Sequence, residues 1–137
     1  MNVRSFLDSN ILVYTDDQRA PDKRSIATDL VRAGVRSRKA VLSNQVLSEY
    51  FVSATRKLGV TAEVARRKIV LLSRLNTVML EVADVLSAID LHRLHQIAYW
   101  DALILRAAAR AGCKRVYSED LQDRQVFGDV EIVNPFK

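Results

Sequence analysis

Four acidic residues that lie far apart in the sequence could together perform metal-dependent chemistry: Asp8, Glu49, Asp101 and Asp120. Carboxylates that meet in one pocket repel one another and raise one another's pKa values. Hard divalent cations relieve that repulsion, and a ligand set made only of oxygen atoms suits Mg²⁺ or Mn²⁺. The chain has two histidines and one cysteine, so no His–Cys cluster competes for zinc. We therefore expect a magnesium or manganese site if these acids converge.

Asp8 stands at the end of the first apolar segment, residues 3–8, where an open α/β sheet presents its functional residues. It could instead serve as an Asx-type cap for the short helix that follows. Asn10 fits both interpretations, because its amide can satisfy the loop backbone or hold Asp8 in place.

Asp101 lies in a helix, expected over residues 98–111, that is apolar nearly all round. At about 100° per residue, Asp101 shares a face with Ile104, Leu105 and Ala108. Arg106 and Arg110 are expected to mark the solvent side of this helix. A carboxylate on the core-facing side needs a cation, a partner or a water-filled pocket. The alternative is a first-turn acid that the helix dipole favours.

The other two acids are ambiguous when each is considered alone. Glu49 shares its helix face with polar residues and could simply be solvated. Asp120 and Asp123 follow the fourth strand in a loop rich in acids, and such loops are usually solvated. Their position after Ser118, at the carboxyl edge of the expected sheet, nevertheless makes them candidates for the same pocket.

The remaining residues with reactive side chains are not expected to take part. His92 and His95 are expected at the surface or at a helix end, and Cys113 as a small residue beyond a helix terminus. One cysteine permits no internal disulfide, which agrees with a reducing cytoplasm.

Strands and helices alternate along the chain and must position the acids. Strands are expected at 3–8, 40–42, 77–82, 115–118 and 130–133. Helices are expected at 11–14, 23–37, 44–57, 61–75, 83–95 and 98–111, with a loop over 16–22 that Pro21 marks. This order predicts a mostly parallel sheet covered on both faces, with ligands at the carboxyl ends of its strands. The first and fourth strands are commonly adjacent in such sheets, which would place Asp8 beside Asp120.

Composition agrees with one ordinary domain over residues 1–137. We expect neither a signal peptide nor a membrane anchor, because no apolar run approaches the roughly 20 residues that span a bilayer. The net charge of +5 favours an anionic partner such as nucleic acid.

Five short segments in order, FLDSNILVY, SEYF, YWDALIL, YSEDLQD and IVNPF, resemble those of PIN-domain proteins over essentially the whole chain. The resemblance is closest to the bacterial toxin ribonucleases of the VapC type. Ser9 stands where that family often has Thr, and both residues supply a hydroxyl.

The resemblance implies a three-layer α/β/α sandwich with a five-stranded sheet and an endoribonuclease that uses Mg²⁺ or Mn²⁺. It implies that Asp8, Glu49, Asp101 and Asp120 form the acidic pocket, with Asp8 and Asp101 as direct metal ligands. It gives supporting roles to Asn10, Ser118 and Asp123. It also implies a homodimer, an RNA substrate and a cognate antitoxin that blocks the site.

Three further hypotheses concern the substrate and the class of function. Arg32, Arg36 and Arg38 are candidates for gripping the RNA backbone, although exposed helix faces are often basic. An aspartyl-phosphate phosphatase typically needs an acid where the chain has Asn10, and a phospho-receiver domain needs acid and lysine positions that the sequence lacks. The non-enzymatic alternative is a catalytically silent RNA- or protein-binding domain whose acidic pocket docks a basic partner.

Overall fold

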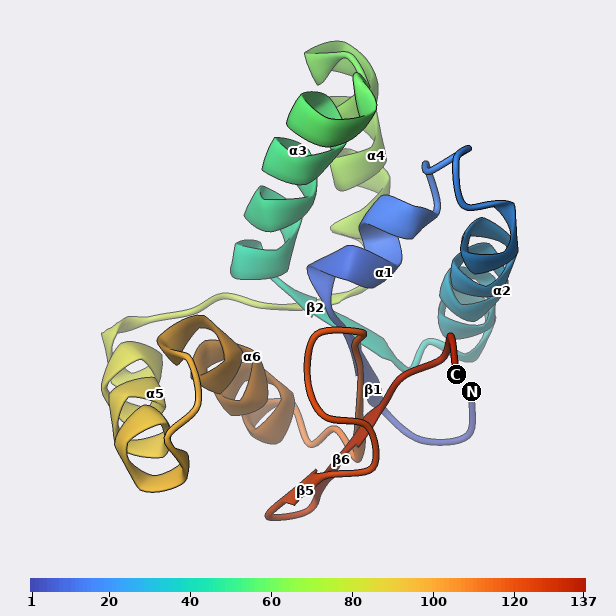
Figure 1. The fold of residues 1–137 in the computed structure, drawn as a ribbon. Coiled ribbons are helices and arrows are strands. Elements are labelled where there is room, and N and C mark those ends of the chain that lie inside the picture. The colour runs from blue at the N-terminus through green and yellow to red at the C-terminus, as the bar shows by residue number, and fades with distance from the viewer.

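A six-stranded sheet runs through the computed structural model, which describes residues 1–137 (Figure 1). Its strands are Ser5–Leu7 (β1), Ala40–Ser43 (β2), Asn76–Val78 (β3), Arg115–Tyr117 (β4), Val126–Phe127 (β5) and Val130–Val133 (β6). The strand order is β3-β2-β1-β4-β6-β5, and only the β5–β6 pair is antiparallel. The predicted mostly parallel α/β architecture is confirmed.

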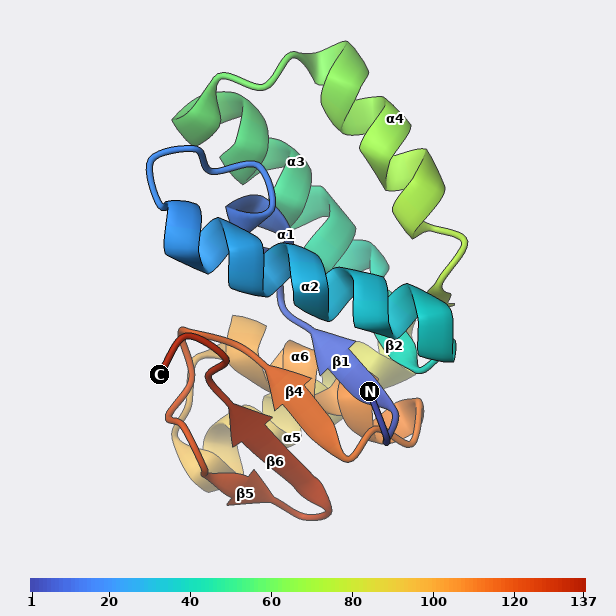
Figure 2. The same ribbon diagram turned by 90° about the vertical axis from the view of Figure 1, so that its right-hand side faces the viewer.

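Six helices cover both faces of this sheet, as three layers require. They are Ser9–Tyr14 (α1), Pro21–Ser37 (α2), Asn44–Leu58 (α3), Ala62–Leu72 (α4), Val82–His95 (α5) and Tyr99–Arg110 (α6). Figures 1 and 2 show α1 to α4 on one side of the sheet and α5 with α6 on the other. No helix of the structure combines the length and the apolar character that crossing a membrane requires.

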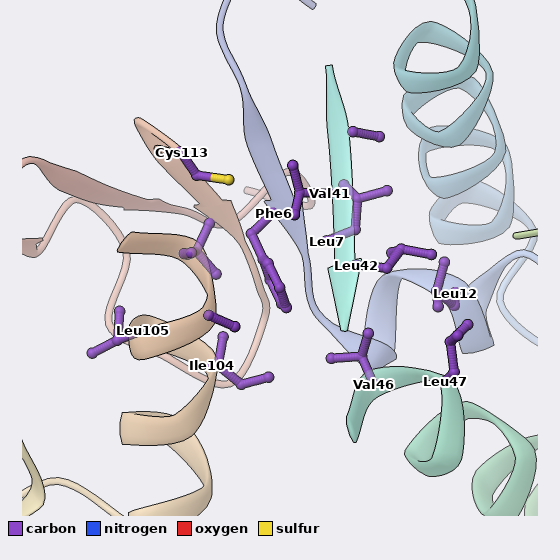
Figure 3. Close-up of a cluster of buried hydrophobic side chains, with 14 of the residues drawn as sticks. Phe6, Leu7, Leu12, Val41, Leu42, Val46, Leu47, Ile104, Leu105 and Cys113 are labelled. Carbon is purple, nitrogen blue, oxygen red and sulfur yellow. The ribbon is translucent and has the colours of Figure 1, made fainter. Parts of the chain in front are cut away.

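Strands β1 and β2 are entirely buried, which agrees with their mainly apolar sequences. Successive side chains point to opposite faces, so each strand packs against the helices of both layers. In Figure 3, Phe6 points towards Ile104 on α6, whereas Leu42 points towards Leu12 on α1. Burying both faces of the sheet in this way fixes the strand register, because a slip of one residue would exchange the faces.

The sheet has one strand more than predicted. The additional strand, β5, has only two residues, too few to show an alternating pattern, and it forms a short hairpin with β6. The third strand ends at Val78 rather than Val82, because the Leu80 amide donates to Asn44 Oδ1 at 3.1 Å and leaves the sheet. These differences leave the predicted order of strands and helices intact.

Pro21 does not lie in a loop as expected but is the first residue of α2. Proline is well suited to this position, since its fixed φ matches a helix and its missing N–H would have no partner there.

Arg106 and Arg110 do not simply mark the solvent side of α6, as the helical wheel suggested. Arg106 Nε lies 2.9 Å from Asp84 Oδ1, and Arg110 Nη1 lies 2.6 Å from Asp84 Oδ2. The Asp84 side chain is only 2% exposed, so the two arginines supply the charge that lets a carboxylate lie between α5 and α6. The Glu81 amide also donates to this carboxylate at 2.9 Å.

The order of the strands creates a switch point between β1 and β4. From β1 the chain builds outward through β2 and β3, then crosses back to place β4 on the other side of β1. In open α/β sheets, ligands bind at such a point, outside the carboxyl ends of the strands. Asp8 directly follows β1, and Ser118 directly follows β4, so both lie at this position.

Candidate active site

Asp8 is a buried carboxylate, 5% exposed, at the junction of β1 and α1. Its Oδ1 accepts a hydrogen bond from the Ser9 amide at 2.7 Å, so Asp8 does cap α1. Its Oδ2 accepts a hydrogen bond from Ser118 Oγ, also at 2.7 Å. Burial raises the pKa of Asp8, and the charges of Asp120 and Asp101 raise it further, against the lowering effect of these two hydrogen bonds. Asp8 is therefore both the cap of α1 and a residue of the candidate site.

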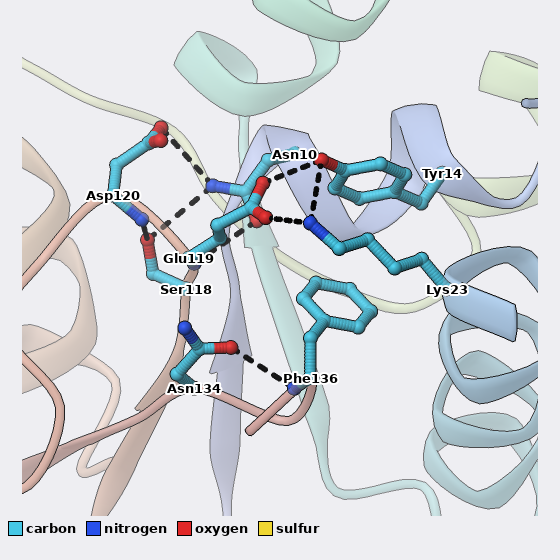
Figure 4. A network of polar contacts seen from close by, with 8 residues as sticks. All are labelled: Asn10, Tyr14, Lys23, Ser118, Glu119, Asp120, Asn134 and Phe136. Atoms are coloured by element: carbon cyan, nitrogen blue, oxygen red, sulfur yellow. Dashed lines mark hydrogen bonds and ion pairs between the residues drawn. The ribbon is translucent and has the colours of Figure 1, made fainter. Parts of the chain in front are cut away.

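Asn10 and Ser118 join Asp8 to Asp120. Asn10 Nδ2 lies 3.3 Å from Asp8 Oδ2, 3.3 Å from Ser118 Oγ and 3.2 Å from Asp120 Oδ2. The hydroxyl of Ser118 also accepts a hydrogen bond from the Asp120 amide at 3.1 Å. These contacts, which Figure 4 shows except for those of Asp8, place Asp8 and Asp120 side by side, as predicted from the adjacency of β1 and β4.

Glu49 and Asp101 approach the same point from α3 and α6. Both side chains are half-buried. Burial raises the pKa of Glu49, and the charges of Asp8 and Asp101 raise it further. The pKa of Asp101 is likewise raised, first by burial and then by the charge of Asp120. All four predicted acids therefore lie close enough to interact electrostatically, although they come from four different segments of the chain.

The four carboxylates gather without closing on a common point. No group of three or more Asp, Glu, His or Cys side chains is drawn together tightly enough to hold a metal ion. The amide nitrogen of Asn10 lies between Asp8 and Asp120 and donates to both. The four acids form a cluster, the acidic depression, that is bordered by the cavities that Asp120 and Glu49 line, and its side chains must shift to share one cation.

A second polar network, which was not predicted from the sequence, lies beside this depression and supports it. Glu119 forms an ion pair with Lys23 and accepts a hydrogen bond from the Tyr14 hydroxyl at 2.7 Å, as Figure 4 shows. The amide of Glu119 donates to Asn10 Oδ1 at 3.3 Å. The Tyr14 ring meets Phe136 edge to face at 5.0 Å. This network connects α1, α2, the loop after β4 and the carboxyl-terminal segment behind Asn10.

Only one feature of the sequence indicated this second network. Tyr14, Glu119 and Phe136 fall in three of the five segments that resemble the family. The ion pair with Lys23 lowers the pKa of Glu119, although burial acts in the opposite direction. The pKa of Glu119 is therefore lowered by its neighbours, whereas the pKa values of Asp8, Glu49 and Asp101 are raised.

Other predicted residues lie apart from the four acids. Asp123 Oδ1 accepts a hydrogen bond from the Asn134 amide at 2.7 Å and makes no hydrogen bond to the four acids. His92 and His95 are exposed at the end of α5, and Cys113 is buried just beyond α6, as expected.

The basic residues that line a cavity beside the acids are not those expected. A cavity of about 250 Å³ next to Asn10 and Asp120 is also lined by Arg19 and Lys57. Three arginines are exposed, as predicted: Arg32, Arg36 and Arg38. However, only the first turn of α2, which contains Lys23, lies beside the depression, and the helix then runs towards the opposite edge of the sheet. There the Arg38 carbonyl accepts a hydrogen bond from Asn76, the first residue of β3.

Comparisons with known proteins agree with this architecture. The family model of the PIN domain matches residues 5–127. A comparison with curated proteins gives no significant match. Among solved structures, the chain is similar to a toxin–antitoxin complex from Klebsiella pneumoniae, with 18% identity and a TM-score of 0.67 over 96% of this chain and 97% of that one.

A second similar structure is VapC20 of Mycobacterium tuberculosis, described as a sarcin–ricin loop cleaving toxin. It has 21% identity and a TM-score of 0.67, over 85% of this chain and 89% of that one. At these identities, the two structures establish a shared fold.

Proposed function

This chain belongs to the PIN-domain family, and from that premise we propose that it is a metal-dependent endoribonuclease that hydrolyses RNA phosphodiester bonds. The observation that carries the proposal is the gathering of Asp8, Glu49, Asp101 and Asp120 at the switch point of the sheet. Buried, mutually repelling carboxylates destabilise a fold, so their presence points to a functional site. These acids can receive the scissile phosphate of a polyanion only when bound cations offset the repulsion between the negative charges.

The donor set fits a hard divalent cation. The depression offers carboxylate, hydroxyl and amide oxygens and no sulfur or imidazole, which suits Mg²⁺ or Mn²⁺. We propose Asp8 and Asp101 as the direct ligands. When bound, such an ion would supply stabilisation of negative charge on the scissile phosphate and acidify the attacking water.

The residues of the chain have distinct roles in this proposal. Ser9 and Ser118 hold the two oxygens of Asp8 in a fixed direction through their hydrogen bonds. Glu49 and Asp120 would position the attacking water or share a second ion. Asn10 would relieve the repulsion between the Asp8 and Asp120 carboxylates when no cation is present, since its amide donates to both.

Lys57 and Arg19 would hold the RNA backbone beside the acids, since both line the cavity that reaches Asn10 and Asp120. The Arg19 guanidinium pairs with Asp17 only through Nε, at 3.2 Å, and its side chain is 71% exposed. Contacts of this kind position a nucleic acid without reading its sequence.

We further propose that the protein is the toxin of a toxin–antitoxin pair, inhibits translation in the cytoplasm and is held inactive by a cognate antitoxin. The similarity to a toxin–antitoxin complex and to a sarcin–ricin loop cleaving toxin supports this role. A homodimer is supported by the apolar outer face of α5, where Val82 is 75% and Leu86 58% exposed.

The test is digestion of purified RNA by the wild-type chain and by Asp8→Asn and Asp101→Asn, each with Mn²⁺ and with chelator. Both variants are expected to remain folded and to lose cutting. Asp90→Asn, at an exposed position on α5, is the matched control and should cut normally. Wild-type turnover by both site variants would overturn the proposal.

A catalytically silent RNA- or protein-binding domain is the second candidate, favoured by the failure of any three acids to close on a common point. Thermal unfolding separates the two. A metal site should raise the unfolding midpoint when Mn²⁺ is added, by mass action, and Asp101→Asn should remove that increase. An unchanged midpoint, together with RNA that survives in Mn²⁺, would favour the silent domain.

A further inference from the structure

A larger cavity adjoins the acidic depression on its other side, between α3 and α6. It has a volume of about 460 Å³, and its lining includes Gln45, Glu49, Trp100 and Leu103. This volume falls within the range of roughly 300–1,000 Å³ that is common for small-ligand sites. Because Glu49 belongs both to this wall and to the group of four acids, a molecule held here lies next to the proposed reaction centre.

Trp100 gives this cavity an aromatic wall. It is the only tryptophan of the chain and is 62% exposed. It directly precedes Asp101 on α6, where the four residues after Asp101 are buried. Tyr99 meets its ring edge to face, with centroids 5.2 Å apart, and so supports its orientation. An exposed indole beside a site for nucleic acid offers a π-face on which an unpaired base can stack.

Gln45 supplies a polar group in the same cavity. Its Nε2 donates to the Trp100 carbonyl oxygen at 3.3 Å, which directs the amide, because the opposite orientation would bring two acceptors together. The other amide atom, Oε1, is the single buried side-chain oxygen or nitrogen in the structure without a hydrogen-bond partner. Such an atom costs free energy while it has no donor, and because it is shielded from solvent the Gln45 side chain must turn towards the cavity before a ligand can supply one.

We propose that this cavity binds one unpaired base of the RNA substrate, which stacks on Trp100 and donates an N–H to Gln45 Oε1 once the Gln45 side chain turns towards the cavity. The inference rests on the proposed ribonuclease function and adds to it a means of choosing the site of cleavage. Backbone contacts through Lys57 and Arg19 carry no sequence information and a stacked ring accepts every base, whereas a hydrogen bond to a base edge distinguishes bases. It also requires the RNA to be single-stranded, or a loop, at this position.

Fluorescence of the single tryptophan tests the stacking directly, without any catalysis. The Asp8→Asn variant is titrated with a short single-stranded RNA of mixed sequence, in Mg²⁺ and in chelator. Stacking is expected to quench Trp100 emission. An abasic oligonucleotide of equal length is the matched probe, and it should bind through its phosphates with little quenching. Equal quenching by both oligonucleotides would overturn the base site.

Cleavage of a randomised single-stranded RNA library tests the choice of base. Sequencing of the wild-type products should show enrichment of particular bases at one position near the cut. Trp100→Phe, which keeps an aromatic face, should retain that preference. Trp100→Ala should lose it and cut with an efficiency lower by on the order of tenfold, the usual scale for one stacked base. Gln45→Met should relax the preference while stacking persists.

Leu71→Ala is the control, because Leu71 is a similarly exposed apolar residue, 59% exposed, on α4. Unchanged enrichment in Trp100→Ala would overturn the base site while leaving the ribonuclease intact. Failure of the ribonuclease itself gives a different result, since no library member would be cut in Mn²⁺. Trp100 emission that is already blue-shifted in the free protein and insensitive to RNA would show that another protein chain covers the cavity, and would also overturn the inference.

Discussion

The hydroxyl of Ser118 donates a hydrogen bond of 2.7 Å to the carboxylate of Asp8, across 110 positions of sequence. The two residues follow β4 and β1, which are neighbours in the sheet. Ser118 is fully buried and makes its other contacts with Asn10 and the Asp120 amide. One buried hydroxyl therefore sets the relative positions of three of the site residues.

Ser118→Ala should weaken catalysis by raising the pKa of Asp8. The hydrogen bond from Ser118 is a cause that lowers this pKa against the dominant effect of burial, so its loss moves the pKa upward. Since the ionised form of Asp8 is the one that binds a cation, the acid limb of the profile of kcat/KM against pH should move to higher pH. We expect a loss of roughly 10- to 100-fold at neutral pH, typical when a residue that orients a ligand is removed.

The control is Ser73→Ala, at the exposed carboxyl end of α4. A Ser118→Ala enzyme with the wild-type pH profile would show that this hydroxyl does not govern the ionisation of Asp8.

The sequence predicted that Asp8 and Asp120 would meet because their positions follow from chain order and sheet topology. Asp8 and Asp120 follow strands, and a mostly parallel sheet brings such ends to one edge. Asp101 stood out because an acid among apolar helix residues requires an explanation. Glu49 was recoverable only from the family resemblance, since its own helix face is polar.

The second polar network and the Asp84 cluster could not be predicted in the same way. Both depend on which long side chains meet across helices, for example Lys23 with Glu119 and Arg106 with Asp84. Periodicity places a residue on one face of a helix, but it does not say which helix packs on that face. The two-residue strand β5 was missed because it is too short to carry a pattern.

Lys57→Ala should weaken RNA binding about equally for all sequences and leave the turnover of bound substrate nearly unchanged. Lys57 is exposed and lines the cavity beside Asp120. Removal of one phosphate contact should reduce the slope of log affinity against log salt by about 0.7 for a single strand. Affinity is measured by titrating the Asp8→Asn background at several salt concentrations. Arg32→Ala is the control, and an equal change in both variants would show that no local phosphate contact exists at Lys57.

Asp84→Asn should destabilise the packing of α5 on α6 by about 1–3 kcal/mol. The backbone hydrogen bond from Glu81 is the main cause of the lowered pKa of Asp84, and Arg106 and Arg110 lower it further. The unfolded chain, with an Asp pKa of about 3.9, therefore takes up the proton first as pH falls. The stabilisation is present in full above that pKa and is lost as pH falls through the lower folded value.

Denaturant unfolding of Asp84→Asn and wild type at neutral pH and near pH 3 measures this loss. The two proteins should differ most at neutral pH and converge in acid, whereas Asp90→Asn should follow wild type throughout. A difference that stays constant with pH would contradict an ionised Asp84.

Cys113 should resist alkylation in the folded protein. Burial raises the pKa of its thiol to about 11, and the side chain is only 2% exposed. Thiolate is the reactive form, so very little is available at pH 8. Iodoacetamide treatment followed by mass spectrometry should detect labelling only after denaturant is added. Rapid labelling of the native protein would mean that the segment after α6 opens readily.

Gly34→Ala should destabilise the fold even though alanine favours helices. A Cβ at position 34 of α2 would lie 2.5 Å from the Cβ of Ala40 on β2, closer than carbon atoms can approach. The helix gains about 1 kcal/mol from the exchange, whereas overpacking costs about 1–3 kcal/mol, so we expect a net loss and a lower unfolding temperature. The double variant Gly34→Ala/Ala40→Gly removes the clash, and it should show a favourable coupling energy that the single variants do not predict by addition. Ser25→Ala, exposed on the same helix, is the control for helix propensity. If Gly34→Ala unfolds at the wild-type temperature or above, α2 can move away from β2 at little cost.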